Sequence, residues 1–413
     1  MISKLKYEYL LSIIAISWII FFSYTIQLTP YFSVYGDDGS YLYSAKSLYY
    51  DFKVDSSRPL LISAIHGLPF LFGFSILNVI KWGFFLNFCS WIFTVLLLFK
   101  IISKKINRKV AFVFSLFFVF CIGNLAIAFN FLSESIFIFL ILISIYLLLQ
   151  FYDSGRYYYI TLSIAFLALN SLIKPISIGL VVVLLIFYIR NIKLIFINKY
   201  SWVILFSFFL VFFQMNSLKK SHGDYTLSYI GSITYYNYLG TKANCYKKNI
   251  EFNPGTNERA KSIRQKSSHE IKKIAEEDLK NQIINNKFNL LKAYLFCIYS
   301  NSTKGSYIVS QTKNKKETMY FDLFYYSFKA ISKLQNILFT FLAVVLSFYY
   351  LIKVRKEKYF TVISVFILYI FFISAMSCLQ CDRFHIAFFP LLLILITKFI
   401  SDKTKRFSEP LQK

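Results

Sequence analysis

The sequence has few charged residues, and among the charged residues few are acidic. Charged residues make up 16% of the 413 positions, whereas 57% are hydrophobic and 20% aromatic, and the mean hydropathy is +0.55. This composition excludes a soluble multidomain protein and indicates an integral membrane protein. Lysine and arginine (46) outnumber aspartate and glutamate (20). Because the basic residues lie between apolar runs or in one polar segment, we expect lipid headgroups and phosphates as partners, and no nucleic acid.

Cysteine is scarce, and the sequence has no internal repeat. Six cysteines do not form a disulfide framework, although Cys245 and Cys297 are candidates for one disulfide in an oxidising compartment. Cys378 and Cys381 have the C-x-x-C spacing, but no second Cys/His pair lies nearby, so zinc is not expected. A cleavage site with small residues is also missing after the basic N-terminus, which predicts a retained first helix.

The apolar stretches predict about ten transmembrane helices, since about 20 residues cross a bilayer. The run from 157 to 192 is too long for one helix. Lys174 and Pro175 supply a charge and a helix breaker in its middle, so it is expected to form two helices that meet at one membrane face. The expected spans are 8–27, 76–99, 110–129, 132–152, the two halves of 157–192, 200–217, 336–352, 359–377 and 386–400.

The positive charges predict the orientation of these spans. Every second connection carries the lysines and arginines that are typical of cytoplasmic loops. An even number of spans then puts both termini in the cytoplasm. The opposite, external face would hold 28–75, 130–133, the Lys174 turn, 218–335 and 378–385.

Three regions are expected along the chain: a transmembrane catalytic module at 1–217 with its first external loop at 28–75, an external cap at 218–335, and C-terminal transmembrane helices with a cytoplasmic tail at 336–413. The cap begins with "GDYTLSYIGSITYYNYLG", which suits a loop or short strand over a sugar site. Helices lying on the membrane surface are expected after it. Its candidates for acceptor contact are Tyr235, Tyr236 and Asn237.

This topology gathers most of the unexplained ionisable residues on the external face. Such residues are costly at membrane depth and usually face a cavity or a partner. Any one of them alone is equally well explained as a snorkelling anchor or a structural ion pair, but their convergence favours a functional site. They are Asp37, Asp38, Arg58, His66, Glu134, Lys174, Asp382, Arg383 and His385.

Several motifs resemble those of GT-C glycosyltransferases that use polyprenyl-phosphate-linked sugars, the superfamily of protein O-mannosyltransferases and the lipid A aminoarabinose transferase. The block "GDDGSYLYSAKSL" is similar to the first-loop motif, with Tyr41 and Ala45 after the acid pair. "SRPLLISAIHGLPFLFG" from Ser57 is similar to the following segment, although Leu60 replaces its second proline. "LSESIFIFLILISIYLLL", "SLIKPISIGL" and "DRFHIAFFPLLLIL" continue the order of the family.

The resemblance implies an all-α polytopic membrane protein of GT-C fold, with external juxtamembrane helices and an inverting hexosyltransferase activity. Asp37 would then be the base, and Asp38 would support it or help to hold a divalent cation such as Mg or Mn. The lipid phosphate would be bound by Arg383, Arg58 and Lys174. Glu134, His66, His385 and Tyr41 would contact substrate.

For several of these residues a structural role is the alternative. Lys174 can cap a helix end before Pro175, and Glu134 can pair with the dipole of its own helix. Lone histidines at membrane interfaces are more often structural than substrate-binding.

The resemblance places the enzyme in a bacterial inner membrane with a periplasmic active site. The composition, rich in Phe, Ile, Lys and Asn, is compatible with an AT-rich gene for surface polysaccharide. On that basis the expected acceptor is a surface polysaccharide such as the O-antigen of lipopolysaccharide, with protein and lipid A as the alternatives. An undecaprenyl or similar phosphate would carry the donor sugar. A donor-synthesising enzyme and a flippase would be its working partners. Two other classes stay open: an O-antigen polymerase or ligase, whose chemistry would concentrate on arginines in late loops, and a lipid or polysaccharide transporter, which would show repeats and midplane charges.

Overall fold

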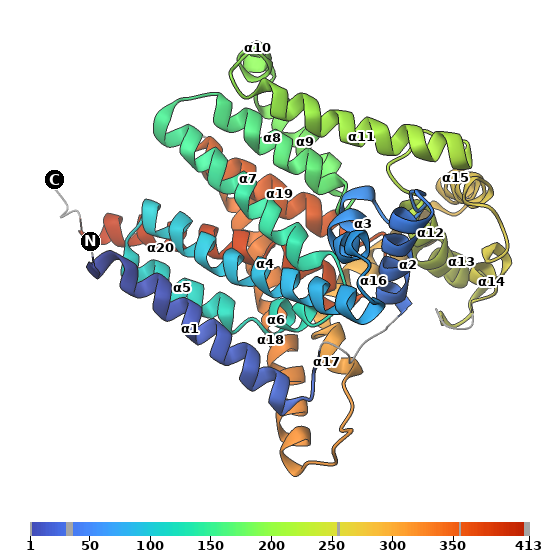
Figure 1. The fold of residues 1–413 in the computed structure, drawn as a ribbon, viewed down its shortest axis with the longest axis horizontal. Coiled ribbons are helices and arrows are strands. Elements are labelled where there is room, and N and C mark those ends of the chain that lie inside the picture. Colours follow the sequence, from blue (N-terminus) through green and yellow to red (C-terminus); the bar gives the residue numbers. More distant parts are fainter. Residues whose placement is uncertain (1, 30–35, 254–256, 355–356, 409–413) are drawn as a thin grey trace.

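The computed structural model describes residues 2–29, 36–253, 257–354 and 357–408, and these residues form helices and connecting turns, with no strand among them. Figure 1 shows the long helices packed side by side, with a group of short helices at one end. Five helices are long and apolar enough to cross a membrane. They are α1 (Ile2–Thr25), α4 (Ile76–Lys105), α7 (Glu134–Ser154), α11 (Ser201–His222) and α18 (Met319–Lys353).

Two bent pairs raise the number of candidate spans to seven. In the first, α9 (Ser177–Phe187) meets η2 (Ile189–Asn191) and α10 (Ile192–Phe196) at 73°. In the second, η4 (Cys381–Ala387) meets α20 (Phe389–Ser408) at 53°. The chain is therefore an α-helical membrane protein with five to seven candidate spans.

The other three of the ten expected spans form shorter helices. The stretch at 110–129 is divided into α5 (Arg108–Val119, 12 residues) and α6 (Ile122–Ala128). The first half of 157–192 is α8 (Tyr158–Ser171, 14 residues), and 359–377 is α19 (Lys358–Ser374, 17 residues). At a rise of about 1.5 Å per residue these helices are shorter than the hydrocarbon core of a bilayer. The expected break at Lys174 and Pro175 is confirmed, since α8 ends and α9 begins on either side of it.

The helix expected at 336–352 begins 17 residues earlier than its apolar run, because α18 starts at Met319. Its first half carries charges, but Phe321, Phe328, Ser332 and Asn336 are buried on one face. Residues at spacings of three and four lie on the same side of a helix, so this face packs while the charged side stays exposed. Helix α18 therefore runs without a break across residue 335.

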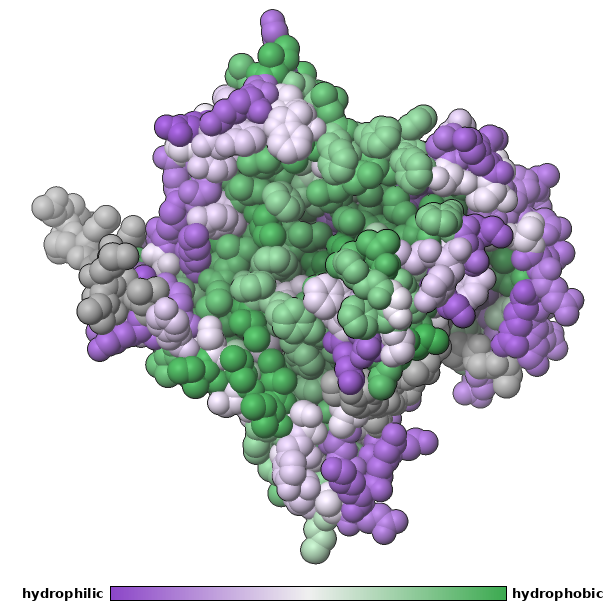
Figure 2. Space-filling model, viewed as in Figure 1, coloured by the Kyte–Doolittle hydropathy of each residue, from purple (hydrophilic) through white to green (hydrophobic). Residues whose placement is uncertain are grey.

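The buried core is built around α7, which packs against α4 and α8, while α11 covers α8. Helix α20 contacts α4, α5, α18 and α19. The start of α1 and the end of α20 lie on the same side of the molecule in Figure 1. Figure 2 shows a broad hydrophobic face over the long helices and polar residues beyond it at both ends. Large exposed apolar side chains over such a face are typical of a surface covered by lipid.

Three short helical elements follow one another before α4: α2 (Gly36–Tyr50), α3 (Leu60–Gly67) and η1 (Leu68–Phe72). The polar region after α11 is also mostly helical. Of the stretch for which a loop or short strand was expected, 223–229 form a loop, whereas the residues from Ile230 onward are helical. Its elements are α12 (Ile230–Tyr235), the π-helical turn η3 (Tyr236–Gly240), α13 (Thr241–Lys248), α14 (Glu258–Ile263), α15 (Ser268–Asn285), α16 (Lys287–Thr303) and α17 (Tyr307–Gln311). Helices α12 to α16 contribute residues to a small second core, whereas the buried residues of α17 belong to the main core.

The candidate disulfide between Cys245 and Cys297 does not form. Cys297 in α16 is bonded to Cys378, just after α19, and Cys245 is a free, buried cysteine. The two bonded residues are 81 positions apart, and both belong to the second core of the polar region. Tertiary packing brings these cysteines together, and their sequence spacing carries no sign of it. The disulfide fastens the polar region to the C-terminal helices.

Candidate catalytic site

The acid pair Asp37 and Asp38 lies in the first turn of α2. Carboxylates at this position interact favourably with the positive end of the helix dipole. Consecutive side chains on a helix point about 100° apart. The Asp37 side chain is 41% exposed, whereas Asp38 is buried. The two acids therefore have different surroundings.

Asp37 binds two arginines from distant parts of the chain. Its Oδ1 accepts a hydrogen bond from Nη2 of Arg58 at 2.6 Å, and its Oδ2 accepts one from Nη1 of Arg383 at 2.5 Å. Arg58 precedes α3, and Arg383 lies in η4. Both arginine side chains are almost completely buried, with 11% and 10% exposed. One partly exposed carboxylate thus pairs with two largely desolvated guanidinium groups.

Glu134, the first residue of α7, continues the chain of ion pairs on the other side of Arg383. Its Oε1 accepts hydrogen bonds from Nε of Arg383 at 2.6 Å and from Nζ of Lys174 at 3.0 Å. Lys174 lies in the turn between α8 and α9. We call the resulting set the ion-pair cluster: Arg58, Asp37, Arg383, Glu134 and Lys174.

The structure brings together, from five separate segments, five residues that the sequence singled out. Their catalytic and binding roles stay predictions, but their proximity is now a fact of the fold. The ammonium group of Lys174 donates a hydrogen bond to Glu134. Lys174 therefore forms an ion pair, whether or not it also caps the end of a helix before Pro175. Glu134 begins α7, so pairing with the helix dipole and pairing with cations occur together.

Arg58 is held in place by residues that the sequence analysis missed. Oδ1 of Asp55 accepts the backbone N–H of Arg58 at 2.7 Å, and Oγ of Ser40 accepts its Nε–H at 2.9 Å. The guanidinium group lies 4.3 Å from the ring centre of Tyr41, within cation–π range. Ser40 follows Asp37 by three residues, which places both on one helix face. The spacing of three residues after Asp37 could have identified Ser40 as a neighbour of the site.

Helix α2 is fastened to the segment that leads into α7. The hydroxyl groups of Tyr41 and Ser133 are hydrogen-bonded at 2.9 Å. Nδ2 of Asn130 donates to Oδ2 of Asp38 at 3.3 Å, and the carbonyl of Asn130 accepts from Nδ2 of Asn87 at 2.6 Å. The buried acid of the pair is therefore set in a hydrogen-bonded frame, apart from the arginines that bind the exposed acid.

Neither predicted histidine makes a hydrogen bond to the ion-pair cluster within the described ranges. His66 is fully buried in α3 with its ring centre 4.3 Å from that of Phe131. His385 is fully buried in η4, with Nδ1 2.9 Å from Oγ1 of Thr340 and Nε2 3.2 Å from Oγ of Ser374. These contacts suit the structural alternative for His385, since they tie η4 to α18 and α19. Substrate contact by either histidine stays a prediction.

The helix that carries Arg383 packs closely on α6. Asp382 is buried, and its Oδ1 accepts the backbone N–H of Tyr307 at 3.3 Å. Gly123 in α6 faces this carboxylate so closely that a Cβ at position 123 would overlap Oδ2 of Asp382. A glycine is needed there because the acidic side chain occupies the space. This close contact positions η4 against α6, and Arg383 is the next residue of η4 after Asp382.

The arginines determine the protonation of Asp37. Burial alone would raise the pKa of this carboxyl group, but the charges and hydrogen bonds of Arg383 and Arg58 hold the pKa well below its ordinary value of 3.8. Burial also raises the pKa of Tyr41, which keeps its hydroxyl neutral. Asp37 is therefore ionised at neutral pH. A carboxylate with such a low pKa is a weak base until a guanidinium group moves away.

The acid pair does not fit a divalent cation as it is arranged here. Both oxygens of Asp37 face guanidinium groups, and Asp38 is buried with an amide donor on Oδ2. A magnesium or manganese ion would have to displace at least one arginine, since these metals prefer oxygen ligands without a neighbouring cation. Among the described residues there is also no group of three or more potential metal ligands. We therefore derive no step through a metal ion.

The residues expected to contact an acceptor lie in the polar region. The hydroxyl of Tyr235 donates to Oδ2 of Asp278 at 3.0 Å, and the guanidinium group of Arg259 lies 4.2 Å from the ring centre of Tyr236. Asn237 lines a pocket of about 320 Å³. The two tyrosines thus take part in local packing, and Asn237 alone faces a cavity.

Together, the helices define the class of this chain: a multi-pass α-helical membrane protein with a buried ion-pair cluster. Comparison with protein-family models, curated proteins and solved structures finds no match.

Proposed function

We propose that this protein is a membrane glycosyltransferase of GT-C type. It would move a sugar from a polyprenyl-phosphate donor to a hydroxyl group of an acceptor glycan such as O-antigen, on the periplasmic face of a bacterial inner membrane. The proposal rests on one observation above others, the convergence of two acids and three cations in the ion-pair cluster. A cluster of this kind has the groups that sugar transfer from a lipid phosphate requires.

The charge balance of the cluster supports phosphate binding. It has three cationic side chains and two carboxylates, so it is not neutralised by its own acids. A phosphate group placed beside Arg58 and Arg383 would offer the two guanidinium groups several oxygens, the kind of partner that they bind well. It would also compete with Asp37 for them.

This competition gives Asp37 its catalytic state. When the donor phosphate binds the guanidinium groups, Asp37 loses their charges and hydrogen bonds, so its pKa rises and it becomes a better base. Asp37 then accepts the proton of the acceptor hydroxyl. The acceptor oxygen bonds to the anomeric carbon from the face opposite the phosphate, and the bond from that carbon to the phosphate oxygen breaks with inversion.

The electron pair of the broken bond leaves on the polyprenyl phosphate. Arg58, Arg383 and Lys174 would stabilise the negative charge that develops there. Glu134 holds two of these cations in place through Oε1. A positioned base and positioned cations are the two contributions that the chain would make to the rate.

The test compares wild-type membranes with Asp37→Asn in transfer from radiolabelled polyprenyl-phosphate hexose. We expect transfer to fall by about a hundredfold or more, the usual contribution of a general base. Asp153→Asn is the matched control, because Asp153 is also an aspartate bound by two cations, Lys104 at 2.8 Å and Lys105 at 3.1 Å. It should transfer at the wild-type rate.

Loss of folding is separated from loss of chemistry by measuring thermal unfolding of both purified variants. Arg383→Lys keeps the positive charge but loses the forked pair of N–H groups. We expect it to raise KM for the polyprenyl-phosphate sugar. If no sugar leaves any polyprenyl carrier in wild-type membranes, or if Asp37→Asn transfers as fast as Asp153→Asn, the proposed activity is wrong.

A further inference from the structure

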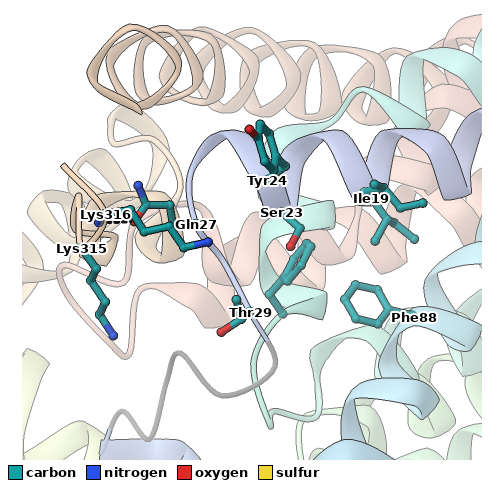
Figure 3. Close-up of a pocket in the computed structure, with 10 residues that line it drawn as sticks. Ile19, Ser23, Tyr24, Gln27, Thr29, Phe88, Lys315 and Lys316 are labelled. Atoms are coloured by element: carbon teal, nitrogen blue, oxygen red, sulfur yellow. Dashed lines mark hydrogen bonds between the residues drawn. The ribbon is translucent and has the colours of Figure 1, made fainter. Parts of the chain in front are cut away.

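A cavity of about 480 Å³ lies between the C-terminal end of α1, the middle of α4, the segment after α6 and the connection from α17 to α18. Its volume is within the range of sites that bind small molecules or parts of lipids. Figure 3 shows two lysines at one end of the cavity and Ile19 and Phe88 at the other. The cavity is therefore amphipathic along its length.

The apolar end of the cavity includes a residue of the exposed apolar side of α1. It is lined by Ile19, Ile20, Phe88 and Phe129. Ile20 is 64% exposed and belongs to an exposed stripe with Ile13, Ile16 and Tyr24. These four residues follow each other at three or four positions, so they form one side of α1. A hydrocarbon chain can enter the cavity from this side without crossing water.

The polar end is a fixed structure. Nε2 of Gln27 donates to Oδ1 of Asn314 at 2.9 Å and to Oγ1 of Thr318 at 3.1 Å. Oε1 of Gln27 accepts the backbone N–H of Lys316 at 3.0 Å. These bonds tie the connection before α18 to the end of α1 and hold Lys315 at the same rim.

The charge at this rim is positive. Lys315 and Lys316 line the cavity, and none of its described lining residues is acidic. Glu317 follows them in the chain, but Lys313 precedes them, so the segment keeps a surplus of two positive charges. Positive residues beside the ends of membrane helices attract anionic headgroups.

We propose that this cavity binds an anionic phospholipid of the leaflet that surrounds the C-terminal end of α1. One acyl chain lies between Ile20, Phe88 and Phe129, and the phosphate lies at Lys315 and Lys316. From Thr25, the last residue of α1, to Ile19 the helix rises about 9 Å, so the cavity holds the upper part of the chain and the rest continues into the bilayer.

The phospholipid site and the ion-pair cluster are separate but adjacent. Phe129 lines the cavity, and the next residue, Asn130, donates to Asp38. The lysines of the rim make no described ion pair with the cluster. The assignment of a phospholipid to this cavity therefore does not depend on the proposed glycosyltransferase activity.

The test uses phosphatidylglycerol with a photoreactive group in one acyl chain, added to purified protein in nanodiscs. We expect labelling of peptides from α1 and α4, and about tenfold weaker labelling in Lys315→Gln/Lys316→Gln. The matched control is Lys247→Gln/Lys248→Gln, which removes two exposed neighbouring lysines of α13 and should label as the wild type does. Ile20→Trp, which fills the opening, should reduce labelling with both lysines intact.

Two further probes separate the occupants. A phosphatidylcholine analogue with the same photoreactive chain should label about tenfold less. Equal labelling by both lipids, or unchanged labelling of the Lys315/Lys316 double variant, overturns the proposal. If equimolar polyprenyl phosphate abolishes the labelling, the cavity belongs to an isoprenoid lipid, and the phospholipid assignment is also overturned.

Discussion

Replacing Glu134 by glutamine is the sharpest test of the ion-pair cluster as a desolvated network. The change keeps the size of the side chain and removes its charge. Oε1 of Glu134 accepts from both Arg383 and Lys174, and its side chain is only 2% exposed. One substitution therefore deprives two cations of a shared partner.

The structure sets the size of the effect. Removing one partner of a buried ion pair costs about 3–5 kcal/mol of stability. Arg383 keeps its pair with Asp37, so the cation left without a partner is mainly Lys174, whose side chain is 17% exposed and can reach some water. We therefore expect a loss at the lower end, about 3 kcal/mol.

The measurement is thermal or denaturant unfolding of purified protein in one detergent. Asp153→Asn again serves as control. Asp153 and its partners Lys104 and Lys105 are each about a third exposed, and such exposed pairs contribute about 1 kcal/mol or less. Glu134→Gln/Lys174→Met should recover part of the loss, because the unpaired cation is then absent. If Glu134→Gln unfolds at the same temperature as Asp153→Asn, the ion-pair cluster does not make the expected contribution to the free energy of unfolding.

Three other outcomes follow from single contacts. Because pairing lowers the folded-state pKa of Asp37, its contribution is present above the unfolded pKa and lost below about pH 4, so Asp37→Asn should flatten this part of the profile of Tm against pH. Gly123→Ala should destabilise by about 1–3 kcal/mol through overlap with a buried carboxylate, whereas Gly231→Ala, which meets nothing within 4 Å, should not destabilise; equal unfolding temperatures would contradict this. Mass spectrometry of unreduced digests should find Cys297 linked to Cys378, and linkage to any other cysteine would refute the pairing.

The sequence alone determined the class of the protein and the approximate positions of its long apolar helices. Long apolar runs cannot be solvated, so their helical structure and membrane setting follow from composition. The break at Lys174 and Pro175 also follows from local chemistry, since a proline in the interior of a helical run removes a backbone hydrogen bond and breaks the helix. The five residues of the ion-pair cluster could be selected because charges beside apolar runs are costly and need partners.

Only the tertiary structure decided which partner each charge has. Asp37 and Arg383 are 346 residues apart, and nothing in their spacing predicts that Oδ2 meets Nη1. The separation of the two acids into one bound by arginines and one set against Asn130, the true partner of Cys297, and the early start of α18 also depend on packing between distant elements. Local patterns record which residues avoid water or require a partner, whereas the choice of partner is made by the geometry of the whole fold.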